Sequence, residues 1–136
     1  MRRGWLIAAV ALLALFGVQR CQRSYARMAT VHVEVLSHTA TKLFSLLASG
    51  RRPDSMEEFR YPSARGREFL AEFDGDSARI SYAKLSALLD RYDELVQRAA
   101  DARVGGIGRA DLEAMEQRRD DVLALAVDVR TELDRE

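Results

Sequence analysis

The sequence is poor in the residues that build catalytic, metal and disulfide chemistry. It contains one cysteine, two histidines and one tryptophan in 136 residues. A single cysteine excludes an intramolecular disulfide. His32 and His38 are six residues apart and point in different directions on a helix, whereas a zinc site needs three or four convergent ligands. No nucleophile–base pair accompanies them. We therefore expect a protein that is not an enzyme and that has no cofactor and no metal.

Helix-breaking residues are also scarce. Both prolines, Pro53 and Pro62, and three of the eight glycines fall between residues 50 and 76. The long stretches on either side lack proline, and none shows the two-residue alternation of a half-buried strand. The sequence therefore predicts an all-α fold.

A concentrated basic surface is missing from the body of the chain. The formal net charge is zero, but the first 27 residues hold five arginines and no acid, which leaves 16 basic and 21 acidic side chains in the rest. Nucleic-acid binding requires clustered positive charge. A mildly acidic body with dispersed charges therefore excludes nucleic acid as a partner.

One long apolar run is present at the start of the chain. Trp5 to Val18 is apolar apart from Gly17, and Arg2 and Arg3 precede it. A spanning helix prefers about 20 residues and needs at least ~17, so residues 4–19 are just long enough. Small residues suitable for signal cleavage occur only late, at Ser24 to Ala26. We expect residues 1–24 to be an uncleaved signal-anchor that contacts the lipid bilayer through residues 4–19.

The same stretch predicts where the body lies. A short positive start before an apolar run is what the export machinery takes as its signal, although Arg20 and Arg23 oppose that orientation under the positive-inside rule. Cys21 resembles a lipoprotein cysteine by position only. The lipoprotein signal needs Gly, Ala or Ser just before the cysteine, and Arg20 occupies that place. We expect a single-pass protein of the bacterial inner membrane with its body in the periplasm or otherwise outside the cytoplasm.

The rest of the chain, residues 25–136, predicts a helical bundle. Apolar or small residues recur in three- and four-residue steps within residues 25–49, 77–103 and 109–133, as in coiled-coil seams. Met28, Val35, Phe44 and Leu46 are expected to widen the first of these stripes. Glycines at 105, 106 and 108 predict a tight reversal between the last two helices. The predicted fold is an N-terminal membrane helix followed by an antiparallel three-helix bundle with one short additional helix.

The short additional helix is predicted at residues 62–74, with Pro62 in its first turn. Ser55 or Asp54 would cap a separate short turn just before it. This irregular segment concentrates aromatic side chains, and two of them, four residues apart, face the same way. We take it as a candidate interaction site, formed by Phe59, Tyr61, Phe69 and Phe73.

Arg119 is a further candidate because it falls on the apolar seam of the last helix. An unpaired charge there would be costly. Arg119 should therefore either pair with Asp90 or Asp93 across the hairpin or mark a place where the seam is open to a partner. We favour the prediction that Arg119 forms this ion pair within the chain.

Two functions fit these features. The first is a membrane-tethered interaction or scaffold protein of the cell envelope, which would contact a protein partner through its bundle surface or its aromatic segment. The alternative is a small-molecule sensor or carrier with a pocket between the helices, under residues 59–73. A carrier needs a lined internal cavity, whereas an interaction protein should have a filled core and an exposed apolar patch.

Overall fold

The computed structural model describes the backbone of residues 2–136 and the side chains of residues 7–15, 24–102 and 106–136. Four α-helices follow one another along the chain: α1 (Arg2–Ala48), α2 (Glu57–Glu72), α3 (Ile80–Gly105) and α4 (Arg109–Arg135). A single 3-10 turn, η1 (Asp74–Asp76), separates α2 from α3. The described chain contains no strand, so the predicted all-α class is confirmed.

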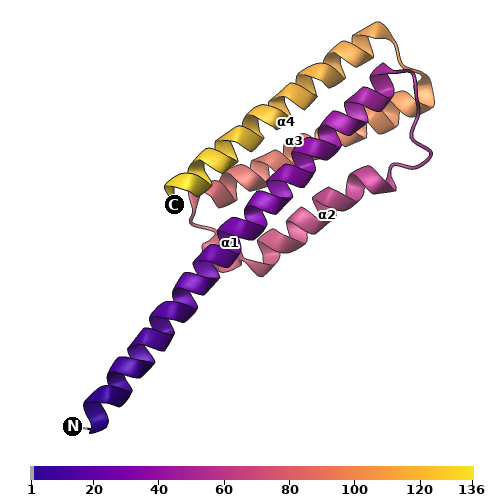
Figure 1. Ribbon diagram of the computed structural model, residues 1–136. Helices are drawn as coiled ribbons and strands as arrows, with labels where there is room; N and C mark the ends of the chain where they lie inside the picture. Colours follow the sequence, from indigo (N-terminus) through magenta and orange to yellow (C-terminus); the bar gives the residue numbers. More distant parts are fainter. Residues whose placement is uncertain (1) are drawn as a thin grey trace.

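Helix α1 belongs to two parts of the molecule. It is one unbroken helix of 47 residues. Its C-terminal half packs against α2, α3 and α4, whereas its N-terminal half projects from the bundle as a free rod (Figure 1). The helix predicted at residues 25–49 is therefore the second half of a longer helix that also contains the apolar run.

A glycine ends α1. Gly50 has a φ of 76°, a conformation that only glycine adopts without strain. Its N–H donates to the carbonyl of Leu47, and the N–H of Arg51 donates to that of Leu46. This pair of bonds is the Schellman motif, which satisfies carbonyls left free at a helix end.

Helix α2 begins earlier than predicted. It starts at Glu57 and not at residue 62. The residues that were expected to form a separate short turn form the first turn of this helix. The N–H of Glu57 donates to Ser55 Oγ at 3.1 Å, but the N-cap residue is Met56, which makes no side-chain cap hydrogen bond. Pro62 lies inside the helix, where it lacks the N–H that would donate to the carbonyl of Glu58. Burial of Met56 and Phe59 offsets this loss.

Helices α3 and α4 form the predicted antiparallel hairpin. Gly106, with a φ of 86°, ends α3, and Asp111 Oδ2 accepts from the N–H of Gly108 at the start of α4. Helix α3 begins at Ile80, three residues later than expected. Residues 74–76 form the 3-10 turn, and Arg79 is extended, with its side chain 2.7 Å from Asp76 Oδ1.

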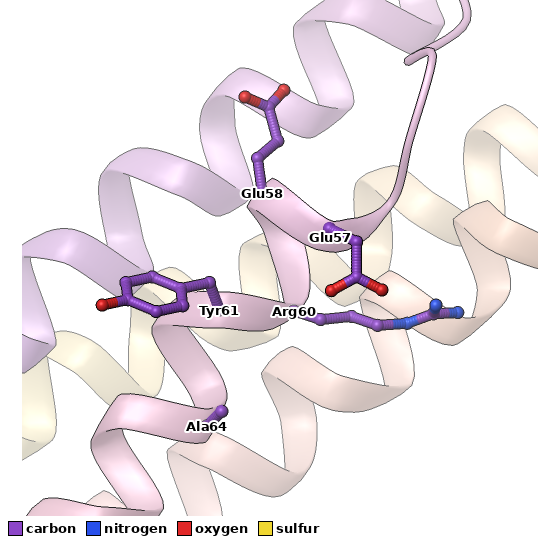
Figure 2. A pocket seen from close by; sticks show the side chains of 5 residues that line it. All are labelled: Glu57, Glu58, Arg60, Tyr61 and Ala64. Atoms are coloured by element: carbon purple, nitrogen blue, oxygen red, sulfur yellow. The ribbon is translucent and has the colours of Figure 1, made fainter.

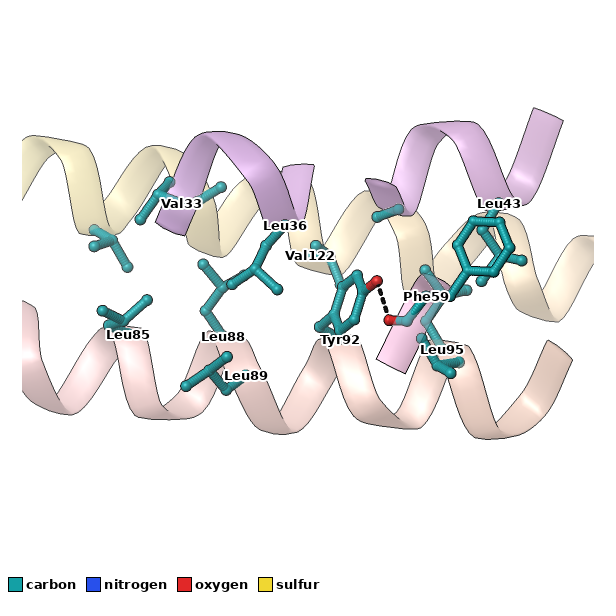
Figure 3. Close-up of a cluster of buried hydrophobic side chains, with 14 of the residues drawn as sticks. Val33, Leu36, Leu43, Phe59, Leu85, Leu88, Leu89, Tyr92, Leu95 and Val122 are labelled. Carbon is teal, nitrogen blue, oxygen red and sulfur yellow. Dashed lines mark hydrogen bonds between the residues drawn. The ribbon is translucent and has the colours of Figure 1, made fainter. Parts of the chain in front are cut away.

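The core lies between the four helices, which run up, down, up and down (Figure 1). Figure 3 shows its centre, where Tyr92 Oη donates to the carbonyl of Phe59. The predicted seams are confirmed on all three long helices, since most of their members are fully buried. These members are Ala29, Val33, Leu36, Ala40, Leu43, Leu85, Leu88, Tyr92, Leu95, Met115, Val122, Ala126 and Val129.

Helices α2 and α3 approach each other closely at one glycine. A Cβ atom built on Gly66 would lie 2.7 Å from Cδ2 of Leu89, a side chain that is fully buried. Because Leu89 is held by the core, it has little room to move. Glycine at position 66 therefore sets the distance between the two helices.

Candidate functional site

The first candidate surface is the projecting part of α1. Ile7, Val10, Leu12, Leu13 and Leu15 are between 59% and 73% exposed, although each is a large apolar residue. They point all round the helix, as the 100° step between residues requires. Within the part of the chain that the structure describes, no helical stretch reaches the length and apolarity needed to cross a membrane. The remaining side chains of the predicted 4–19 segment, Trp5 among them, lie outside the described residues.

A second apolar surface continues along α1 into the bundle. Met28, Val31 and Val35 are exposed, Val31 to 55%. Phe44 and Leu46 pack partly buried against the core and widen the buried stripe as expected, whereas the same expectation is wrong for Met28 and Val35. They lie about 90° to 120° away from the centre of that stripe at 100° per residue, and the neighbouring helix α2 does not cover them.

The four candidate aromatic residues are divided by the structure. Phe59 and Phe69 are buried in the core, and Phe73 packs partly buried against it. Tyr61 is 65% exposed on the outer side of α2. The four rings therefore do not form one surface, and Tyr61 is the one of the four that presents its ring to solvent.

Phe69 and Phe73 belong to an aromatic cluster at the end of the bundle where α1 enters it. Their ring centroids are 4.9 Å apart, and the Tyr25 ring lies within 5.8 Å of both. The His32 ring packs 4.9 Å from Phe69. Burial, together with the charge of Arg65, lowers the pKa of His32, so this ring is neutral at physiological pH.

Next to this cluster, a polar network joins three helices. Tyr25 Oη lies 3.0 Å from Ser81 Oγ, which donates to Glu136 Oε2, while the N–H of Ser81 donates to Glu136 Oε1 at 3.0 Å. Arg79 reaches both Glu136 and Asp76, and its guanidinium lies 4.9 Å from the centroid of the Tyr25 ring. Glu136 thus serves as the cap that the first turn of α3 does not obtain from its own N-cap residue.

The sequence pattern gives no sign of this network. Its members come from residues 25, 79–81 and 136, and no local pattern links positions that are 55 residues apart. Burial raises the pKa of Tyr25, which keeps its hydroxyl protonated at physiological pH. The network joins the start of α3 and the end of α4 to the middle of α1.

Two surface hollows lie along α2. The larger, of about 470 Å³, is lined by Glu57, Glu58, Arg60, Tyr61 and Ala64, with Arg60 and Tyr61 extending to opposite sides of the helix (Figure 2). The smaller, of about 370 Å³, follows the groove between α2 and α3. Both are open to the outside of the bundle, and neither lies in the core between the three long helices.

The predicted partner of Arg119 is wrong. Asp90 and Asp93 bind Arg67 of α2, at 2.9 Å and 2.5 Å. Arg119 pairs instead with Asp120 of its own helix, and its guanidinium lies 4.3 Å from the centroid of the Phe44 ring on α1. The seam at position 119 turns toward α1, so the charge is placed over an aromatic face at the edge of the core.

No group of three or more His, Cys, Asp or Glu side chains among the described residues is arranged to hold a metal ion. His38 is exposed and stands apart from His32. The side chain of Cys21 lies outside the described residues.

Comparison with known proteins gives no relative: the chain matches no protein-family model, and no curated protein or solved structure is significantly similar to it.

Proposed function

We propose that this protein is a membrane-tethered helical interaction protein, anchored through residues 4–19, whose bundle contacts another protein outside the cytoplasm. The observation that carries the proposal is the exposure of Ile7 to Leu15 on the projecting half of α1. Leaving such side chains in water costs about 25 cal/mol per Å² of apolar surface. A bilayer would remove that cost, and the sequence extends the apolar run to both sides of the described segment.

The body is suited to contacts with proteins more than to carriage of a small molecule. Twelve of its large side chains are fully buried, Tyr92, Leu36 and Val122 among them. A carrier binds its ligand in an enclosed, mostly apolar cavity. The two hollows along α2 open outward, which favours contact with a partner over the carrier alternative.

Membrane attachment can be tested in the whole chain. We expect the wild-type protein in the membrane fraction, resistant to extraction with alkaline carbonate. Replacing Leu12 and Leu13 with arginine should move it to the soluble fraction, because each charge costs roughly 3 kcal/mol at the centre of a membrane helix. The matched control is Val127→Arg, an exposed apolar position on α4, which should leave the protein in the membrane.

A wild-type protein found in the soluble fraction would contradict the proposal. The orientation is tested separately, with a reporter enzyme that is active only outside the cytoplasm, fused after Glu136. An inactive reporter on a membrane-bound fusion would place the body inside the cytoplasm.

A further inference from the structure

Helix α1 carries two apolar seams, and only one of them is used inside the molecule. The buried seam runs from Ala29 to Leu47. The other consists of Met28, Val31 and Val35, which follow one another by three and four residues and are all exposed. This is the a/d spacing of a two-stranded coiled coil, in which such residues pack against a partner helix.

The exposed seam continues in the same register into the projecting half of α1. Steps of four and three back from Met28 reach Ser24, positions 21 and 17, Ala14, Val10 and Ile7. The described members of this series are exposed, as are all the side chains described between residues 7 and 15. Positions 17 and 21, whose side chains lie outside the described residues, hold glycine and cysteine. Small residues on one face of a membrane helix, here at positions 14 and 17, let a second helix approach closely.

Lipid does not reach the upper part of this seam. With a rise of 1.5 Å per residue, Val31 stands about 18 Å beyond Gln19, and Val35 about 24 Å beyond it. The polar layer on each side of the hydrocarbon is only about 5–8 Å thick. Val31 and Val35 therefore lie in water above an anchored membrane face, where exposed apolar side chains gain from a protein partner.

A second copy of the chain matches this seam along its full length. Membrane attachment holds two copies parallel and at the same height, so that each position of α1 meets its own equivalent. The partner then offers apolar side chains opposite Val31 and Val35 and small residues opposite Ala14. Confinement to a membrane also raises the effective concentration of one copy near another. The apolar seam ends at Val35, because the next position is the exposed His38 and the one after it is Lys42, which is paired with Glu58 at 3.7 Å.

We propose that two copies of this protein form a parallel dimer through the exposed face of α1, with Met28, Val31 and Val35 in contact with their equivalents. The dimer rests on the proposed membrane attachment, and it identifies another copy of the chain as a partner of that tethered body.

Cysteine cross-linking of the full-length protein in native membranes tests the dimer. In a Cys21→Ser background, Val31→Cys and Val35→Cys should each give a disulfide-linked species of twice the mass on mild oxidation. Thr30→Cys is the matched control: it is exposed and adjacent in the chain, but it points about 100° away from Val31. It should give several-fold less dimer. Adding Val31→Arg to the Val35→Cys protein should abolish the cross-link and leave the helix content unchanged.

Three results would overturn the dimer: equal cross-linking at positions 30, 31 and 35, no cross-linking of a membrane-bound protein, or a product whose mass is not twice that of the chain. None of these results contradicts the membrane attachment. Attachment is tested independently, by whether the protein is recovered in the membrane fraction. Recovery of all variants in the soluble fraction would instead contradict the attachment itself.

Discussion

At the scale of single residues, buried tyrosines connect elements that are distant in the chain. Tyr92 lies fully buried on α3 and donates to the carbonyl of Phe59 on α2. Tyr25 lies fully buried on α1 and bonds Ser81 at the start of α3. Each ring fills core volume, and each buried hydroxyl has a hydrogen-bond partner on another element.

These two tyrosines make the stability depend on alkaline pH. Burial raises the pKa of both above the ordinary value of 10.0. Above about pH 10 the unfolded chain therefore loses protons that the folded chain keeps. The free energy of unfolding should fall by up to about 1.4 kcal/mol per pH unit for each tyrosine. Below pH 10 this contribution is fully present.

Urea unfolding between pH 8 and pH 11.5 measures that slope. Tyr92→Phe should reduce it, whereas Tyr61→Phe, which changes an exposed ring, should leave it as in the wild type. If Tyr92→Phe and the wild type lose stability at the same rate above pH 10, the buried hydroxyl does not cause the dependence.

Among the elements, α2 has the least independent support. It is 16 residues long, contains a proline, and packs on α1 and α3. Its place is set by the close approach of Gly66 to Leu89, by Phe59 and Phe69 in the core, and by the ion pairs of Arg67 with Asp90 and Asp93. Exposed ion pairs contribute little, so the packing of Gly66 and the two rings holds α2 in position.

Gly66→Ala should therefore destabilise the protein, although alanine is the better helix former. The added methyl would meet Leu89 Cδ2 at 2.7 Å, and overpacking of this kind costs typically 1–3 kcal/mol. Thermal unfolding measures the loss. Gly75→Ala is the control, since nothing lies within 4 Å of a Cβ there. Adding Leu89→Val should recover part of the stability if the methyl clash is the cause, and a fully stable Gly66→Ala protein would refute the close approach.

The whole molecule combines a filled bundle with a projecting helix. Nearest the projecting segment, the end of α2, the start of α3 and the end of α4 are joined to the middle of α1 by the Tyr25–Ser81–Glu136 network and the aromatic cluster beside it. The opposite end carries the Gly50 and Gly106 turns. Any pull on the projecting segment would thus act on the end of the bundle where buried polar and aromatic contacts are concentrated.

The bundle should unfold as one unit when its centre is disrupted. Leu95 is fully buried on α3. An unpaired carboxylate at this position costs several kcal/mol, which is comparable with the roughly 5–15 kcal/mol that stabilise a typical domain. We expect Leu95→Asp to lose its helical circular dichroism and its melting transition. Val127→Asp makes the same kind of change at a position 56% exposed on α4 and should melt like the wild type. A folded Leu95→Asp protein would show that position 95 is not part of the central core.

The sequence by itself determined which residues of each long helix share a face, because helical periodicity is a local property. The seams from Ala29 to Leu47 and from Leu85 to Ala102 could be predicted for this reason, and so could the reversal at Gly106. Periodicity does not specify which helix covers a face. Only the tertiary structure decided that Arg119 faces Phe44 and not Asp93, that Phe59 is buried while Tyr61 is exposed, and that α2 begins at Glu57. It also decided that Met28 and Val35 are left uncovered and that Glu136 caps α3, since these outcomes depend on contacts between segments far apart in the chain.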